Sequence, residues 1–479
     1  MRRHEALNGS GYLKPTAQPE SKTYRVIAFS RDRKELLLLP AGARFLLPPI
    51  EVPRRQRVAE NLTSAMNARW GHDAVCLFPL DVSPSGSRAG ELNYQVMQSC
   101  HSSKTHESPG TWMPVLSLSQ ESFADAADYV AIQRSLIECE AHAQCPREGP
   151  FARPGWFEQL REWVEKTIRP LGLHLTGRFR QLNASPSFSL IRFETNGPAV
   201  WFKAVGEPNL KEFPITLTLA RLFPQYLPRI LATQPAWNGW IAPEIEGTNL
   251  SETQEIVLWN SAVMALAQLQ IQSMGKLDAI LGSGARDVKA SNLANLIHPF
   301  LDSMDRLMKE QTNVPPPVLT SKELARLGMQ IQNAFSGFEE LRIPDTLGSL
   351  DLNPGNIVVS SNHCAFLDWA EAYVGHPFFS FQYLLEHFRR APEKNSAHES
   401  ELTRSYLKYW ERWSTADNVA EALTFSPLLA VFAYAVASHS WASPERLKNP
   451  GTAGYLRSLT RRMNREATQL IDRRLPCLC

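Results

Sequence analysis

The stretch of sequence that decides the fold lies at residues 347–359 and reads Leu-Gly-Ser-Leu-Asp-Leu-Asn-Pro-Gly-Asn-Ile-Val-Val. A second stretch, at residues 365–369, reads Ala-Phe-Leu-Asp-Trp. The first predicts a loop that carries Asp351, a turn at Pro354-Gly355 and an apolar strand that Asn356 opens. A further turn then leads into a return strand that ends at Asp368. This layout places one carboxylate and one carboxamide at the mouth of a loop, and a second carboxylate on the return strand.

Such a set of side chains suits phosphoryl transfer to a hydroxyl group. One aspartate orients the attacking hydroxyl and accepts its proton, and hard oxygen ligands hold Mg²⁺ against the phosphates. Asp351 is the candidate base, and Asn356 and Asp368 are the candidate magnesium ligands. Taken alone, the same residues fit equally well a solvated turn rich in Asx residues, with an aspartate at the end of a strand.

The upstream half of the chain decides between these two interpretations. A kinase needs a strand lysine on the nucleotide phosphates and a helix glutamate that holds this lysine. Lys203 lies among apolar neighbours in the predicted strand Val200–Val205, and Glu212 lies early in the next helix, nine residues later. Singly, Lys203 fits a strand lysine whose ammonium reaches solvent, and Glu212 fits an ordinary acid in the first turn of a helix. The ordered set of all five residues on the required elements favours the kinase.

These motifs resemble those of the aminoglycoside phosphotransferase-like enzymes, and the resemblance runs from about Trp156 to Trp441. Residues 351–356 resemble the loop that the family writes His-Gly-Asp-Leu-His-Pro-Gly-Asn, and Leu367-Asp368-Trp369 resembles its metal-binding Ile-Asp-Trp. The family shares a two-lobed fold with protein kinases. The resemblance therefore implies an α+β, protein-kinase-like fold with ATP and Mg²⁺ as cofactors.

The same resemblance assigns roles to individual residues. Asp351 would be the catalytic base, Asn356 and Asp368 would bind Mg²⁺, and Lys203 with Glu212 would bind ATP. The nucleotide-binding set would also include two serines of the phosphate-covering turn Leu182–Ser189 and two residues where the family has its interlobe hinge: Ser185, Ser187, Ala242 and Glu244.

Three positions depart from the family's pattern. Its first loop histidine is Ser349 here, the following glycine is Leu350, and its second histidine is Asn353. The phosphate-covering turn has no glycine, although backbone amides can still cradle phosphates there. These departures bear on the geometry of the loop rather than on its chemistry, because Asp351 itself is present.

The N-terminal region resembles a second family, the Nudix hydrolases, in which glutamates of a signature helix bind Mg²⁺. Aligned on Gly71, the three metal-binding glutamate positions hold Ala65, Ala68 and Arg69. Neither alanine nor arginine supplies the oxygen ligand that a hard cation needs. We therefore predict a degenerate, Nudix-like α/β/α domain without hydrolase activity, and the alternative is an unrelated small α/β domain.

Composition narrows the class of protein and its compartment. At about 150 residues per domain, 479 residues predict about three structural units. Lys+Arg 50 against Asp+Glu 48 gives a net charge of +2, which favours neither nucleic acid nor anionic membranes as partners. The longest apolar run, Leu428–Ala437, is shorter than the ~20 residues of a membrane span. Seven cysteines in irregular spacing and no signal-peptide pattern predict a cytoplasmic protein.

The order of elements predicts the domains. Residues 1–20 are predicted to be a disordered tail, 21–145 the Nudix-like domain, and 146–154 a proline-rich linker. Residues 155–246 would form a kinase-like N-lobe, which begins with a helix over Trp156–Ile168. Residues 247–479 would form a helical C-lobe with one hairpin-like interruption at Gly348–Trp369.

The sequence thus predicts an ATP-dependent phosphotransferase that acts on a hydroxyl of a small molecule. The leading alternative is a catalytically impaired pseudokinase that serves as a nucleotide-binding or scaffold module, because Ser349 and the glycine-free turn depart from the family. Nudix-type hydrolysis is a third possibility, against which the lost glutamates argue.

Overall fold

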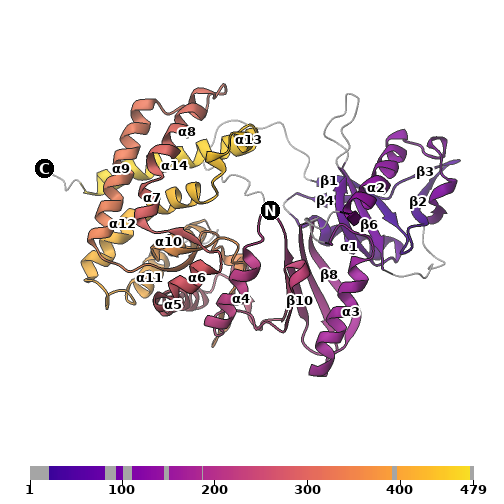
Figure 1. Cartoon of the computed structure of the whole chain (residues 1–479), viewed down its shortest axis with the longest axis horizontal. Helices are drawn as coiled ribbons and strands as arrows, with labels where there is room; N and C mark the ends of the chain where they lie inside the picture. Colours follow the sequence, from indigo (N-terminus) through magenta and orange to yellow (C-terminus); the bar gives the residue numbers. More distant parts are fainter. Residues whose placement is uncertain are drawn as a thin grey trace. The chain divides into compact units, whose positions relative to one another are not determined.

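The computed structural model describes residues 21–54, 56–80, 93–100, 110–144, 150–185, 187–390 and 396–474. These residues form an α+β protein that divides into two compact units (Figure 1). The N-terminal unit contains the described residues up to 213 together with 229–244, and the helical unit contains 214–228 and the described residues from 245 onward. The predicted tail at 1–20 and residues 146–149 of the predicted linker lie outside the described residues.

The first sheet of the N-terminal unit is buried on both faces. Alternate residues of its strand β1 point to opposite sides, as the two-residue period of a strand requires. Val26 and Ala28 pack with helix α1 (Val58–Trp70) on one face, and Ile27 and Phe29 share a core with helix α2 (Ala126–Gln144) on the other. The result is a three-layer α/β/α arrangement, whose Nudix-like ancestry stays a prediction. Its seven strands are β1 (Ser21–Phe29), β2 (Glu35–Ala41), β3 (Arg44–Leu46), β4 (Pro49–Pro53), β5 (Ala74–Leu80), β6 (Asn93–Ser99) and β7 (Thr111–Pro114).

The second sheet of this unit is antiparallel and has five strands in the order β11-β12-β10-β9-β8. Helix α3 (Trp156–Ile168) buries its apolar stripe, including Trp156, Leu160 and Val164, in the core that this sheet contributes to. Helix α4 (Glu212–Leu222) follows the central strand and continues into the helical unit. The strands are β8 (Leu175–Ser185), β9 (Phe188–Thr195), β10 (Val200–Val205), β11 (Ala232–Gln234) and β12 (Gly239–Pro243).

The segment predicted to be a linker is part of the core where the structure describes it. Phe151 and Ala152 are each 1% exposed, and Phe151 packs edge-on against Trp156 with ring centroids 5.3 Å apart. One apolar cluster joins these residues to both sheets. Phe151 and Ala152, which lie within the predicted linker, are therefore core residues of this unit. The boundary between folding units at 146–154 stays a prediction.

The helical unit is built around long helices that share one apolar core. Its helices are α5 (Ile256–Ser273), α6 (Leu277–Gly282), α7 (Ala290–Ala294), α8 (Ile297–Lys309), α9 (Ser321–Glu340), α10 (Phe378–Arg389), α11 (Ser396–Leu407), α12 (Ala416–Ala437), α13 (Pro444–Leu447) and α14 (Pro450–Arg474). Thr320 caps α9 and Glu323 returns the contact, which is the reciprocal capping box. Helix α12 is apolar and long enough to cross a membrane by length and composition, but 67% of its most apolar window is buried in this core.

Two three-stranded sheets interrupt the helices. One is the predicted hairpin, β16 (Ile357–Val359) with β17 (Cys364–Phe366), to which β13 (Thr248–Asn249) adds an edge. The other contains β14 (Arg286–Val288), β18 (Ala372–Gly375) and β15 (Thr346–Ser349), in that order. The sequence did not predict this second sheet, because its three strands have three or four residues each and two of them lie far from the third in the chain. It places β15 directly before the loop of Asp351.

Candidate functional site

The lysine and the glutamate that the sequence singled out form an ion pair within the N-terminal unit. Lys203 lies on β10, the central strand of the five-stranded sheet, and its ammonium bonds to the carboxylate of Glu212, the first residue of α4. The side chains are only 14% and 2% exposed. Because a buried charge without a partner is strongly unfavourable, this pair fixes the position of the ammonium. Phe188 and Trp240 flank it, with their ring centroids 5.7 and 5.8 Å from Nζ.

The connection between β8 and β9 is shorter than the predicted turn. Strand β8 extends to Ser185 and β9 begins at Phe188, so that Leu182 and Ser189 belong to strands. Ser187 lies against the backbone that follows β10: a Cβ on Gly206 would stand 2.9 Å from the carbonyl oxygen of Ser187. The close approach requires glycine at 206, and it brings the connection next to the strand of Lys203.

The residues predicted at the hinge are held by side chains of the same sheet. Ala242 is buried on β12 and pairs with Trp201 of β10. Both oxygens of Glu244 accept hydrogen bonds of 2.7 Å from the guanidinium of Arg192. This contact, with a further hydrogen bond from Trp201, lowers the pKa of Glu244. The Glu244 carboxylate therefore binds Arg192 of the same sheet through both of its oxygens.

In the helical unit, contacts within a few residues shape the loop of Asp351. Ser349 Oγ accepts a hydrogen bond from the Asp351 amide at 3.2 Å, and Asn353 Nδ2 donates to Asp351 Oδ1 at 3.2 Å. Both residues stand where the motif that this loop resembles has histidines. Their hydroxyl and carboxamide supply polar contacts to Asp351 where the family has imidazoles, so the loop is ordered around its aspartate.

Hydrogen bonds also connect Asn356 and the segment before Asp368 to this loop. The Asn356 side chain donates to the backbone oxygen of Asp351 at 3.3 Å, which leaves its Oδ1 as the ligand that it can offer to a cation. The backbone oxygen of Asn356 accepts from the amide of Leu367 at 2.8 Å, directly before Asp368. Asp368 is exposed and has a φ of 61°, a left-handed conformation that is rare outside glycine. Such backbone strain is common at functional sites.

Two side chains near Asp351 were missed by the sequence analysis. The hydroxyl of Tyr383, on α10, donates to Asp351 Oδ1 at 3.0 Å. Glu371 lies in the electrostatic field of both Asp351 and Asp368, and its ion pair with Arg286 measures 2.5 Å. Burial raises the pKa of Glu371, and the neighbouring aspartates raise it further. Neither residue belongs to a recognisable motif. Tyr383 lies on helix α10, and Glu371 lies in the segment before β18.

The chemistry of these side chains fits a magnesium ion. Mg²⁺ is bound in enzymes by one or two carboxylates together with substrate phosphates and water, rather than by a complete protein cage. Asn356 Oδ1 and the Asp368 carboxylate match that requirement. The described residues contain no group of three or more His, Cys, Asp or Glu side chains arranged to hold a metal on their own.

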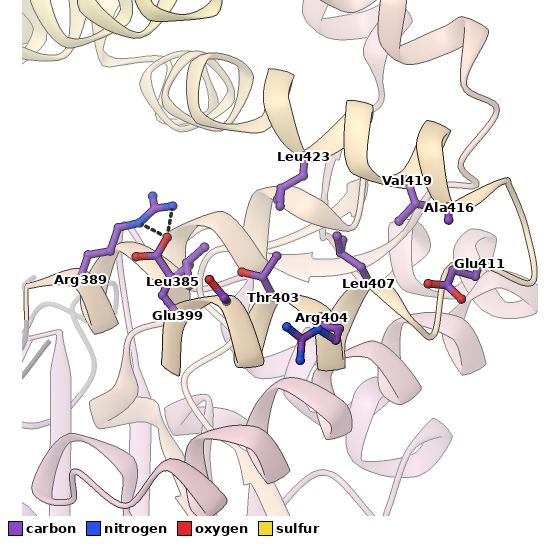
Figure 2. A pocket seen from close by; sticks show the side chains of 11 residues that line it. Leu385, Arg389, Glu399, Thr403, Arg404, Leu407, Glu411, Ala416, Val419 and Leu423 are labelled. Carbon is purple, nitrogen blue, oxygen red and sulfur yellow. Dashed lines mark hydrogen bonds and ion pairs between the residues drawn. The ribbon is translucent and has the colours of Figure 1, made fainter. Parts of the chain in front are cut away.

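A surface hollow of about 440 Å³ lies among α10, α11 and α12 (Figure 2). Leu385, Leu407 and Leu423 form part of its apolar lining, and the ion pair of Arg389 with Glu399, at 2.7 Å, stands at one end. None of its lining residues belongs to the set around Asp351, and its charges do not converge on one point. We assign it no role in the chemistry.

Comparisons with known proteins give weak likenesses. No family model and no curated protein matches the chain. Among solved structures it is similar to the macrolide 2'-phosphotransferase MphH of Brachybacterium faecium, with 18% identity, 61% of this chain and 97% of the other covered, and a TM-score of 0.41. The corresponding values are 12%, 65%, 96% and 0.45 for a choline kinase of Cryptosporidium parvum Iowa II. For the GDP and kanamycin complex of APH(2")-IIIa they are 14%, 65%, 99% and 0.42. At these values the assignment of a function rests on the residues themselves.

Proposed function

We propose that this protein transfers a phosphoryl group from ATP to a hydroxyl of a small molecule. The observation that carries the proposal is the Lys203–Glu212 ion pair. A strand lysine that is held by a glutamate of the next helix is the arrangement that protein kinases use to place the nucleotide phosphates, and Lys203 on the central strand β10 with Glu212 on α4 has this arrangement. Both side chains are largely buried, and taking two charges out of water has a cost in stability. A role in function or in the fold would account for this cost.

The loop of the helical unit supplies the remaining roles. The Asp351 carboxylate, which Tyr383 and Asn353 hold through Oδ1, accepts the proton of the acceptor hydroxyl. Asn356 and Asp368 offer oxygen ligands to Mg²⁺, which when bound neutralises charge on the phosphates. Lys203 orients the phosphates, and Ser185 and Ser187, with the backbone amides beside them, cover the phosphates. Ala242 and Glu244 flank the nucleotide base in this proposal.

A second candidate function is that of a pseudokinase that binds nucleotide without transfer. The absence of glycine from the sequence between Leu182 and Ser189 and the replacement of the family's histidine by Ser349 favour it. The two candidates share ATP binding and differ in turnover. One experiment with two readouts therefore separates them.

The experiment measures thermal stabilisation by ATP with and without Mg²⁺, alongside ADP release over a panel of hydroxyl compounds that includes amino alcohols, sugars, aminoglycosides and macrolides. A ligand at a hundredfold excess over its Kd stabilises the native state by about 2.7 kcal/mol. Asp368→Ala is expected to remove the Mg²⁺-dependent part of this stabilisation. The matched control is Asp302→Ala, which removes an exposed aspartate of α8.

Three results are decisive. Stabilisation with ADP release supports the phosphotransferase. Stabilisation without ADP release for any acceptor supports the pseudokinase. If ATP·Mg²⁺ does not stabilise the wild type at all, both candidates are wrong and the Asp351 loop is a structural turn.

A further inference from the structure

The sheets of the N-terminal unit meet at their edges, and one side chain joins them there. Strand β5 is an edge strand of the seven-stranded sheet, and β8 is an edge strand of the five-stranded sheet. The side chain of Gln181, on β8, accepts a hydrogen bond from the amide of Cys76 at 2.8 Å and donates to the carbonyl oxygen of Cys76 at 3.0 Å. The carboxamide therefore pairs with β5 as a neighbouring strand would.

Both strands are irregular where they meet. The register of β5 with β6 shifts between Cys76 and Phe78, and that of β8 with β9 shifts between Gln181 and Asn183. An extra residue in a strand bends it and redirects its side chains. Gln181 is fully buried and Leu182 is 6% exposed, whereas every second residue earlier in β8 is exposed. At Gln181 and Leu182, β8 is thus covered on both of its faces.

Helix α1 adds two contacts to the same end of β8. The guanidinium of Arg180 donates from Nε to Glu60 at 3.1 Å. Ala184, the last but one residue of β8, packs against the apolar cluster that contains Ala59 and Leu62 of α1. Within five residues of its end, β8 is therefore attached to the first sheet by hydrogen bonds, an ion pair and apolar packing.

This attached end leads directly into the β8–β9 connection. We infer that the first sheet and α1 act as a brace that fixes this connection over the nucleotide phosphates, with Gln181 as the positioning residue. The part of the inference that concerns nucleotide binding rests on the proposed function. The part that concerns the fixing of the connection does not. A glycine-rich loop closes on phosphates by moving, whereas the strand that leads into this glycine-free connection is held in place by the first sheet and α1. Binding then loses less conformational freedom, which favours affinity.

The test compares two buried glutamines of the full-length protein. Gln181→Met keeps the size of the side chain and removes both hydrogen bonds to Cys76. The control is Gln98→Met: Gln98 is 2% exposed, accepts from the Gly155 amide at 2.7 Å and donates to the Arg31 carbonyl at 2.9 Å. The two variants lose equivalent hydrogen bonds within one unit, but only Gln181 holds β8.

Hydrogen exchange and ATP binding are the two readouts. Gln181→Met is expected to speed exchange of the amides of residues 183–189 by about tenfold over Gln98→Met and to raise the Kd for ATP·Mg²⁺ about tenfold, because only about a tenth of the molecules then hold the binding conformation. The KM for the acceptor should stay unchanged. If Gln181→Met does not fold, Gln181→Asn, whose shorter carboxamide cannot reach both groups of Cys76, takes its place.

The outcomes separate the brace from the proposed function. Equal exchange of residues 183–189 in the two variants overturns the brace, whatever the nucleotide data show. Faster exchange in Gln181→Met supports it even if the wild type does not bind ATP, a result that overturns only the proposed function. Faster exchange with an unchanged Kd overturns the role of the connection in nucleotide binding.

Discussion

The loop of Asp351 and the β8–β9 connection are held in contrasting ways. Asp351 bonds to Ser349, Asn353 and Asn356, all within five residues of it, and one contact comes from Tyr383. The connection is held by Gln181 through Cys76, which is 105 residues away in the chain. The conformation of the Asp351 loop is determined largely by residues of the loop itself. That of the β8–β9 connection depends on a separate sheet.

This difference shows which kind of site a motif can find. A loop whose polar groups satisfy each other needs particular residues at fixed spacing, and such spacing is visible in a sequence. A segment that is held by distant elements needs only side chains that pack against those elements. Its sequence can therefore differ from a family pattern while its conformation is kept. The absence of glycine from the connection is therefore weaker evidence against catalysis than it seemed from the sequence.

The largest effect is expected from Asp351→Asn, which tests the chemistry of the local loop. Asparagine keeps the shape of the side chain and can still accept from Tyr383, but it does not take up a proton. Since general base catalysis contributes about 10²- to 10⁴-fold, ADP release should fall by that factor while ATP·Mg²⁺ stabilisation persists. Asp302→Asn, an exposed substitution, is the control. An equal loss of nucleotide binding in Asp351→Asn would show that the aspartate shapes the loop instead.

The second effect concerns the Lys203–Glu212 ion pair. Its partners are nine residues apart in the chain, a separation between that of the Asp351 loop contacts and that of Gln181 and Cys76. Lys203→Met removes the ammonium that the buried Glu212 carboxylate faces. Breaking a buried ion pair in this way costs about 3–5 kcal/mol, which urea unfolding measures. Lys211→Met, an exposed neighbour, should change the free energy of unfolding little.

The double variant Lys203→Met/Glu212→Leu sharpens this test. Replacing both charges by apolar groups is often neutral or stabilising, so most of the lost stability should return while ATP binding stays weak. If the double variant binds ATP as the wild type does, the pair is structural and the proposed function loses its main support.

Short-range patterns were read correctly from the sequence, and long-range contacts were not. The helix at Trp156–Ile168 and the strand at Val200–Val205 have the predicted bounds, because each carries its apolar pattern within itself. The buried Phe151 and the strand β14 were missed, since a single phenylalanine or three residues show no period. Gln181 and Tyr383 gave no signal for the same reason: their partners lie 105 and 32 residues away.

The third effect comes from His376, a buried side chain of the helical unit that the predicted site does not use. His376 stacks on Phe338 with centroids 3.9 Å apart, accepts from the Phe378 amide, and has no hydrogen-bond partner at Nε2 among the described residues. Burial lowers its pKa from 6.5 to about 3. The native state therefore holds the neutral ring while the unfolded chain takes up a proton below about pH 6.5.

His376 should thus stabilise the fold fully above pH 6.5 and progressively less as the pH falls toward 3. Between pH 7 and 5 the loss is about 2 kcal/mol, from one proton taken up only on unfolding. His376→Asn keeps an acceptor for the Phe378 amide and should flatten the pH dependence of urea unfolding by that amount. His298→Asn, on the exposed face of α8, should leave it unchanged. Parallel pH profiles of wild type and His376→Asn would contradict the assignment.

The smallest effect, expected from Tyr383→Phe, tests the contact that Asp351 receives from helix α10. The substitution keeps the aromatic packing on α10 and removes only the hydroxyl that donates to Asp351 Oδ1. Loss of this donor frees the carboxylate to rotate away from the acceptor, so kcat should fall about tenfold, or about 1.4 kcal/mol, with the KM for ATP unchanged. Tyr434→Phe is the matched control, because the Tyr434 hydroxyl bonds to Tyr455. If neither variant loses activity, the local contacts of the loop suffice to orient Asp351, and the contrast between the two regions is complete. If Tyr383→Phe alone loses activity, even the loop that its own sequence encodes depends on a distant helix for the direction of its base.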